Sequence, residues 1–215
     1  SLNNITLDDG LVGYWKLDDG TGSLVARDSS GYGNHGTLTN YDGVQAQTGW
    51  TTLSATGTTF YNPYALEFDA INDYVDVGDD DTLDISNSDI TIAFWVKDNN
   101  PSRTSGYIAK EESSSAGWSI EESRFYIWTS GTNADNAYTN VTDSNWYHMA
   151  YNWNGSVSTI YRNGSVYDTL TTGDGIITTN DESLTIGQAR LSGDAFTRLK
   201  GLIDENTSGN IRLEI

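Results

Sequence analysis

The sequence contains no cysteine and only two prolines in 215 residues. The lack of cysteine excludes disulfide bridges and thiolate zinc sites, and it leaves the redox compartment open. No apolar run reaches the roughly 20 residues of a membrane-spanning helix, and the amino end lacks the basic-then-apolar pattern of a secretory signal. Basic residues are also scarce, because 11 Lys and Arg accompany 30 Asp and Glu, for a net charge of −19. Such a charge repels phosphates and anionic lipids, so we expect neither nucleic acid nor membrane insertion.

Helical periodicity is missing as well. No stretch keeps apolar residues at helical spacing for three turns, whereas period-two alternation recurs along the chain. Residues 90–96 have apolar side chains on both faces, which predicts a central strand between two layers. Residues 147–153 have one strongly apolar face, with His148 on the opposite face, which predicts a half-buried strand.

Two Asn-Gly pairs, at 154–155 and 163–164, are typical of tight hairpin turns because both residues accept positive φ angles. They predict a three-stranded meander over residues 146–170. A dozen short strands in a chain of this length predict one domain, residues 1–215, built as an antiparallel two-sheet sandwich or barrel. The stretch 39–62, rich in Thr and Gly, is interpreted as a long loop or an added edge hairpin.

Four blocks, in this order, resemble the laminin-G-like branch of the concanavalin A-like lectin and glucanase superfamily. They are GLVGYWKLDDGTG with DSSGYGNHGTL, ALEFDAINDYVDVGDDDTLDISNSDITIAFWVK, WYHMAYNWNGSVSTIYRNGSVY, and LTIGQA with FTRLKGLIDE. The resemblance covers about residues 10–205 and implies an all-β jelly roll of two antiparallel sheets, often with calcium near the chain termini. The end departs from the family pattern, because NTSGN (206–210) intervenes before IRLEI, and this leaves the register of the last strand open.

The loop DSSGYGNHG, residues 28–36, is the candidate for that implied calcium. Ca²⁺ takes six to eight oxygen ligands, and glycines let a loop turn its carbonyl groups inward. The resemblance places the opening loop beside the closing strand, so the candidate ligands are Asp18, Asp28, Asn34 and Asp204. The ion would stabilise the folded state by binding only to it. The alternative is an Asx turn that begins at Asp28, with Asp204 on the surface.

Catalytic patterns are incomplete. Retaining glucanases with this fold carry two carboxylates in an E-x-D-x-E strand, but here Ile71 follows Glu67 and Asp69 where the last acid belongs. The two histidines, His35 and His148, cannot form a three-histidine zinc site, and no nucleophile signature accompanies them. We therefore expect no enzymatic activity.

Aromatic residues are abundant, with seven Trp and 13 Tyr. Their rings stack on the C–H faces of sugars while neighbouring polar groups bind the hydroxyls. The candidate ligand-binding residues are Tyr107, Trp118, Tyr126, Trp128 and Tyr138. The alternative is that these rings pack in the core or on a sheet surface.

Together these features predict a non-catalytic, calcium-stabilised binding module, extracellular or displayed on a surface, with glycans as the leading ligand class. Two alternatives stay open. One is a structural or decoration domain that contacts surface proteins of a larger assembly such as a virion or a cell envelope. The other is a degenerate glycoside hydrolase.

Overall fold

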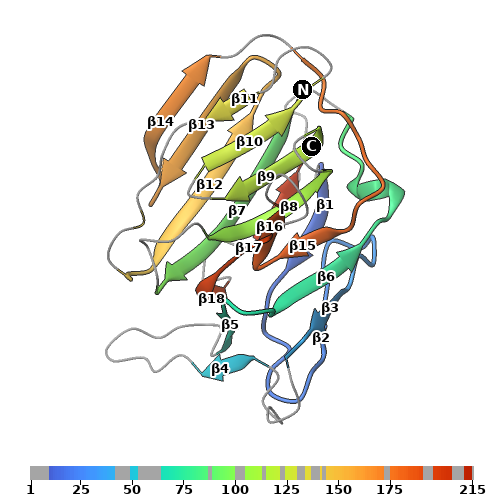
Figure 1. Cartoon of the computed structure of the whole chain (residues 1–215), viewed down its shortest axis with the longest axis vertical. Helices are drawn as coiled ribbons and strands as arrows, with labels where there is room; N and C mark the ends of the chain where they lie inside the picture. Colours follow the sequence, from blue (N-terminus) through green and yellow to red (C-terminus); the bar gives the residue numbers. More distant parts are fainter. Residues whose placement is uncertain are drawn as a thin grey trace, which may run out of the picture.

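A computed structural model of the chain describes residues 10–41, 49–52, 64–86, 89–99, 105–112, 115–121, 124–129, 134–136, 141, 144–171, 175–190, 196–204 and 211–214. Within these ranges the strands form a nine-stranded sheet, an eight-stranded sheet and a two-stranded ribbon (Figure 1). The paired strands run antiparallel in both large sheets. The predicted two-sheet sandwich is therefore confirmed.

The nine-stranded sheet, sheet A, has the order β14-β13-β12-β7-β18-β5-β4, and β19 and β1 extend it beyond the end of β18. Its strands are β1 (Leu11–Trp15), β4 (Trp50–Thr52), β5 (Tyr64–Asp69), β7 (Ile90–Asp98), β12 (Tyr147–Trp153), β13 (Val157–Arg162), β14 (Ser165–Thr171), β18 (Lys200–Asp204) and β19 (Ile211–Glu214). The central position predicted for residues 90–96 is confirmed within the sheet, because β7 pairs with β12 on one side and with β18 and β19 on the other. Its second face, which carries Trp95, is half-buried rather than fully covered by a further layer. Of the irregular stretch 39–62, the described part includes the short edge strand β4.

The eight-stranded sheet, sheet B, has the order β11-β10-β9-β8-β15-β6-β3-β2. Its strands are β2 (Val25–Ala26), β3 (Gly36–Thr39), β6 (Tyr74–Gly78), β8 (Gly106–Glu112), β9 (Ala116–Glu121), β10 (Arg124–Trp128), β11 (Ala134–Asn136) and β15 (Leu184–Ile186). The ribbon consists of β16 (Gln188–Arg190) and β17 (Phe196–Arg198), and a 3₁₀ helix, η1, spans Asp81–Leu83.

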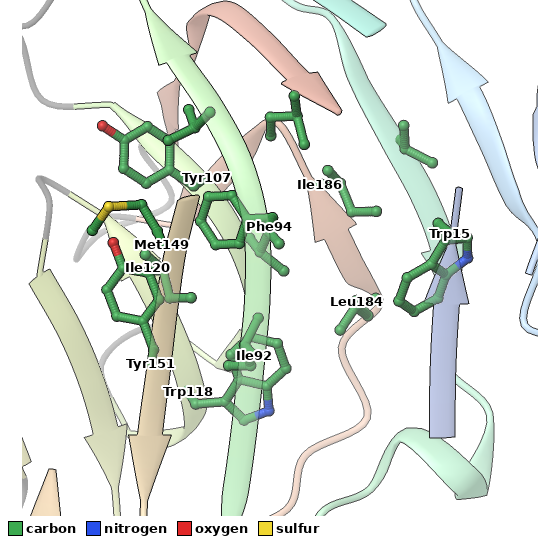
Figure 2. Packing of buried hydrophobic residues seen from close by; sticks show 14 of the residues in the cluster. Trp15, Ile92, Phe94, Tyr107, Trp118, Ile120, Met149, Tyr151, Leu184 and Ile186 are labelled. Atoms are coloured by element: carbon green, nitrogen blue, oxygen red, sulfur yellow. The ribbon is translucent and has the colours of Figure 1, made fainter. Parts of the chain in front are cut away.

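The core lies between the two sheets and follows from the alternation of each strand. On β7, Ile90, Ile92, Phe94 and Val96 are buried, whereas the residues between them are half-buried. Phe94 stacks on Tyr151 of β12 with ring centroids 5.9 Å apart. It also contacts the Tyr107 ring of sheet B, so aromatic rings join the two sheets (Figure 2).

The predicted meander is confirmed, with β12, β13 and β14 joined by two hairpins. Asn163 and Gly164 have φ angles of 51° and 77°, which are the positive values of a two-residue turn. The connection at Asn154 and Gly155 is longer, since residues 154–156 separate β12 from β13. There the Asn154 side chain accepts hydrogen bonds from the backbone N–H groups of Ser156 and Val157.

The closing segment resolves the register that the sequence left open. Asp204 of β18 pairs with Trp95, and Arg212 of β19 pairs with Ala93. The chain moves two residues along β7 between these pairs, from Trp95 to Ala93, but eight residues along the closing segment, from Asp204 to Arg212. The closing segment therefore has six more residues than β7 over this distance. Side chains alternate between the two faces of a sheet with a period of two residues, so an even number of extra residues does not exchange the faces. In β19, as in β18, even-numbered residues therefore share a face with Trp95 of β7.

Candidate functional site

An open hollow lies on the outer face of sheet A, away from the core. Alternation turns Trp95 to this face, since Phe94 and Val96 on either side of it are buried. His148 of β12 is the direct partner of Trp95. The hollow has a volume of about 490 Å³ and is lined by Trp95, Trp146, His148, Asn163 and Gly164. We call it the Trp95 hollow.

The hairpin turn fixes the polar side of the Trp95 hollow. The His148 N–H donates to the Asn163 side-chain oxygen at 3.0 Å, and the Asn163 N–H donates to the His148 carbonyl oxygen at 2.8 Å. These two bonds hold the turn against β12. The amide of Asn163 therefore stands at a defined position beside the rings.

The rings of the Trp95 hollow combine apolar faces with hydrogen-bonding groups. The Trp95 and His148 ring centroids are 5.4 Å apart, with the rings tilted by 57°. The Trp95 Nε1–H is buried and has no hydrogen-bond partner in the described part of the chain. Burial lowers the pKa of His148 from its ordinary value of 6.5, which favours the neutral imidazole near pH 7. A neutral imidazole can donate one hydrogen bond and accept another.

A second, smaller hollow lies on the outer face of sheet B. One row of paired residues crosses this face from Tyr126 through Ser119, Ala109 and Thr185 to Asp76. The hollow opens near the Asp76 end of the row and has a volume of about 170 Å³. We call it the Glu111 hollow; it is lined by Tyr74, Asp76, Ala109, Glu111, Glu182, Ser183, Thr185 and Gln188.

Buried polar groups distinguish the Glu111 hollow. Glu111 and Gln188 are each 4% exposed. The Gln188 side-chain oxygen has no hydrogen-bond partner among the described residues. The neighbouring Lys110 ammonium contacts Asp79 and lies 3.1 Å from Asp84, so its charge is already balanced by carboxylates.

Two of the predicted ligand-binding rings are corrected by the structure. Tyr107 and Trp118 are each 1% exposed and pack inside the core (Figure 2). Buried rings present no face to a sugar, so the alternative interpretation, core packing, holds for these two residues. A bulge between Gly106 and Ile108 interrupts the alternation of β8, and both Tyr107 and Ile108 belong to the core cluster.

The other three predicted rings have different outcomes. Tyr126 and Trp128 project from the outer face of β10 and stack with centroids 6.0 Å apart. Trp128 is only 6% exposed, so Tyr126 is the more accessible ring of the pair. Their role in ligand binding stays a prediction. Tyr138 lies outside the described residues.

The structure gives the Asp28 carboxylate a full set of hydrogen-bond donors. Its Oδ1 accepts hydrogen bonds from the N–H groups of Tyr14 and Ser30. Its Oδ2 accepts from the Ser30 hydroxyl and from the N–H groups of Gly33 and Asn34. These donors occupy the lone pairs that a cation would need. The hydrogen bond to the Ser30 N–H is that of an Asx turn, which is the local geometry that the alternative interpretation expected.

The remaining calcium candidates lie in different surroundings. The Asn34 amide donates to the Val12 carbonyl and to the Thr82 hydroxyl, while Asp18 is exposed. Asp204 is fully buried on β18, which contradicts its interpretation as a surface residue. In the part of the chain that the structure describes, no group of three or more His, Asp or Glu is placed to hold a metal ion. Calcium binding itself stays a prediction.

The incomplete catalytic pattern lies on β5 and the turn after it. Glu67 and Asp69 are exposed, and Ile71 is 71% exposed where the missing acid would stand. Asp69 accepts hydrogen bonds from the N–H groups of Ile71 and Asn72, which makes it a turn residue.

Sequence reasoning missed the Trp95 hollow although its signals were present. Alternation already placed Trp95 and His148 on the faces opposite the core residues of their strands. Pairing of those two strands in register, which brings the two rings together, is a long-range property that no local pattern reports.

Comparison with known proteins gives a family match. A family model described as the concanavalin A-like lectin/glucanases superfamily matches residues 69–207. No curated protein matches the sequence. Among the described residues, no helix is long and apolar enough to cross a membrane.

Solved structures share the fold over nearly the whole chain. Domain 4 of AbnA, an extracellular GH43 arabinanase from Geobacillus stearothermophilus, in complex with arabinotriose, has a TM-score of 0.63 and 17% identity over 95% of this chain and 91% of that chain. The binding domain of Paraclostridial Mosquitocidal Protein 1 has a TM-score of 0.59 and 16% identity over 97% of this chain and 49% of that chain. The binding domain of botulinum neurotoxin DC, in complex with rat synaptotagmin II, has a TM-score of 0.59 and 14% identity over 97% and 49%. This chain thus spans about half of the two toxin chains, and the likeness establishes the fold.

Proposed function

Because the chain belongs to the concanavalin A-like lectin/glucanases superfamily, we propose that it is a non-catalytic binding module for neutral glycans and that it binds them at the Trp95 hollow. The observation that carries the proposal is the arrangement of two indole side chains, an imidazole and an amide around one open hollow. Indole faces stack on the apolar faces of sugar rings, and the polar groups bind hydroxyls.

The buried Trp95 N–H supports this assignment. A buried donor without a partner is costly, and a ligand oxygen would satisfy it. The neutral state of His148 suits an uncharged, hydroxyl-rich ligand, since hydroxyls both donate and accept hydrogen bonds. The arabinotriose complex of domain 4 of AbnA supports a saccharide ligand by analogy of fold.

The test is a glycan array followed by titration of the best neutral oligosaccharide. Trp146→Ala removes one indole from the lining while leaving β7 and β12 intact. We expect its affinity to fall by about tenfold or more, because buried aromatic contacts dominate binding energies. Tyr32→Ala is the control, since Tyr32 is 58% exposed and does not line the hollow.

Two results would contradict the proposal. Equal loss of affinity in both variants would show that the hollow is not the site. An array with no glycan bound would favour the alternative, a module that contacts surface proteins of a larger assembly. The complex of the neurotoxin domain with rat synaptotagmin II illustrates a protein ligand on the same fold.

A further inference from the structure

The Glu111 hollow lies on the sheet opposite the Trp95 hollow and has a different chemistry. Three of its lining residues are acids contributed by separate segments: Asp76 from β6, Glu111 from β8, and Glu182 from the segment before β15. No described lining residue is basic. This composition favours a positively charged group.

A second observation at the same hollow indicates a ligand. The Gln188 side chain is 4% exposed, and its oxygen has no hydrogen-bond donor among the described residues. A buried carbonyl oxygen left without a donor is costly, so a donor supplied by a ligand would stabilise it. A cation that carries hydrogen-bond donors would satisfy Gln188 and would also suit the acidic wall around it.

The requirements of a metal ion help to select the kind of cation. Calcium and magnesium need oxygen ligands at about 2.0–2.6 Å from one centre. No group of three acids or histidines among the described residues meets that requirement. An ammonium group needs no such cluster, because its three N–H donors bind separate acceptors about 2.7–2.9 Å away.

The rest of the lining favours a sugar over a lysine side chain. Tyr74, Ser183 and Thr185 add hydroxyl groups, and Ala109 is the one described lining residue without a polar side-chain group. An aliphatic lysine stem would meet little apolar wall there, whereas a sugar ring presents hydroxyls to such groups. The volume of about 170 Å³ is well above the roughly 10–15 Å³ that one water molecule needs, so the hollow has room for a group larger than water.

We propose that the Glu111 hollow is a second binding site, which takes the ammonium group of an amino sugar. The site is separate from the Trp95 hollow and does not depend on the function proposed for it. The two sites give one module two ligand classes, neutral sugars on sheet A and amino sugars on sheet B.

The experiment compares two trisaccharides with the same sugar backbone, chitotriose with free amines and its fully N-acetylated form, in which each amine is replaced by a neutral and larger acetamide group. Titration of the full chain at about pH 6 keeps the amines protonated. We expect chitotriose to bind at least about tenfold more tightly than the acetylated form, with affinity falling as NaCl rises. Equal affinities for the two sugars, or no binding of chitotriose, would overturn the proposal.

Variants locate the site. Glu182→Gln removes one half-buried acid of the hollow, and Glu67→Gln removes one exposed acid on sheet A as the matched control. We expect a loss of about tenfold or more for Glu182→Gln and less than about twofold for Glu67→Gln. Asp76→Asn replaces Glu182→Gln if that variant fails to fold. Equal losses in the acid variant and its control would overturn the placement.

A lysine probe separates the two sources of an ammonium group. Nα-acetyl-lysine amide should bind at least about tenfold more weakly than chitotriose. Equal or tighter binding of the lysine probe would overturn the sugar assignment. Failure of the neutral glycans alone would leave the amino-sugar result standing, so the two proposals fail separately.

Discussion

His148 makes the outer face of sheet A sensitive to pH. Burial lowers its pKa below 6.5, so the unfolded chain binds the proton more readily than the folded chain does. Its contribution to stability is therefore complete above pH 6.5 and is lost as the pH falls through the lowered folded pKa. We expect the free energy of unfolding in urea to fall from about pH 7.5 to about pH 5.5, and to fall less in His148→Gln.

Comparison of the wild type with His148→Gln separates the contribution of His148 to the pH dependence from that of the other titrating groups. An equal fall in the wild type and in His148→Gln would contradict the prediction. Because the imidazole is partly exposed, the difference should be small, and the unfolding curves need to be measured at matched ionic strength.

Asp28 shows how far a single residue can be interpreted from sequence. The loop DSSGYGNHG correctly indicated a tight polar turn with an acid at its start. Whether that acid binds a cation or backbone N–H groups depends on where Tyr14, Gly33 and Asn34 direct their donors. That choice depends on the packing of β1 against the loop, which the composition of the loop does not encode.

At the scale of elements, strands and hairpins were predictable and their partners were not. Alternation located β7 and β12, and Asn-Gly located the turn after β13. The resemblance to known jelly rolls supplied the two-sheet arrangement. The register of β19 relative to β18 was not predictable. It depends on how many residues lie between Asp204, which pairs with Trp95, and Arg212, which pairs with Ala93.

The β13–β14 turn supports a prediction about one element. Gly164 has φ of 77°, and nothing lies within 4 Å of the position of an added Cβ. Gly164→Ala therefore adds backbone strain without a clash, and we expect the free energy of unfolding to fall by about 1 kcal/mol. Ser165→Ala, at an exposed position of β14, should change it by less than about 0.5 kcal/mol. Equal effects in chemical denaturation would contradict this explanation.

The whole molecule carries a net charge of −19, which opposes its compact state. Salt screens this repulsion, with a Debye length of about 10 Å at 0.1 M. Among the described ion pairs, the one that joins Lys110 to Asp79 and Asp84 has a buried ammonium, so salt weakens it little. We expect the melting midpoint to rise by a few degrees between about 20 mM and about 500 mM NaCl.

Calcium chloride at matched ionic strength separates screening from specific binding. Screening alone gives nearly the same midpoint in both salts, and addition of EDTA then changes nothing. A midpoint several degrees higher in calcium, reversed by EDTA, would support the calcium predicted from the sequence, because a ligand bound only to the folded state adds stability by mass action. A midpoint that is constant or falls with NaCl would contradict the charge argument itself, since repulsion among acidic residues would then not limit the stability of the fold.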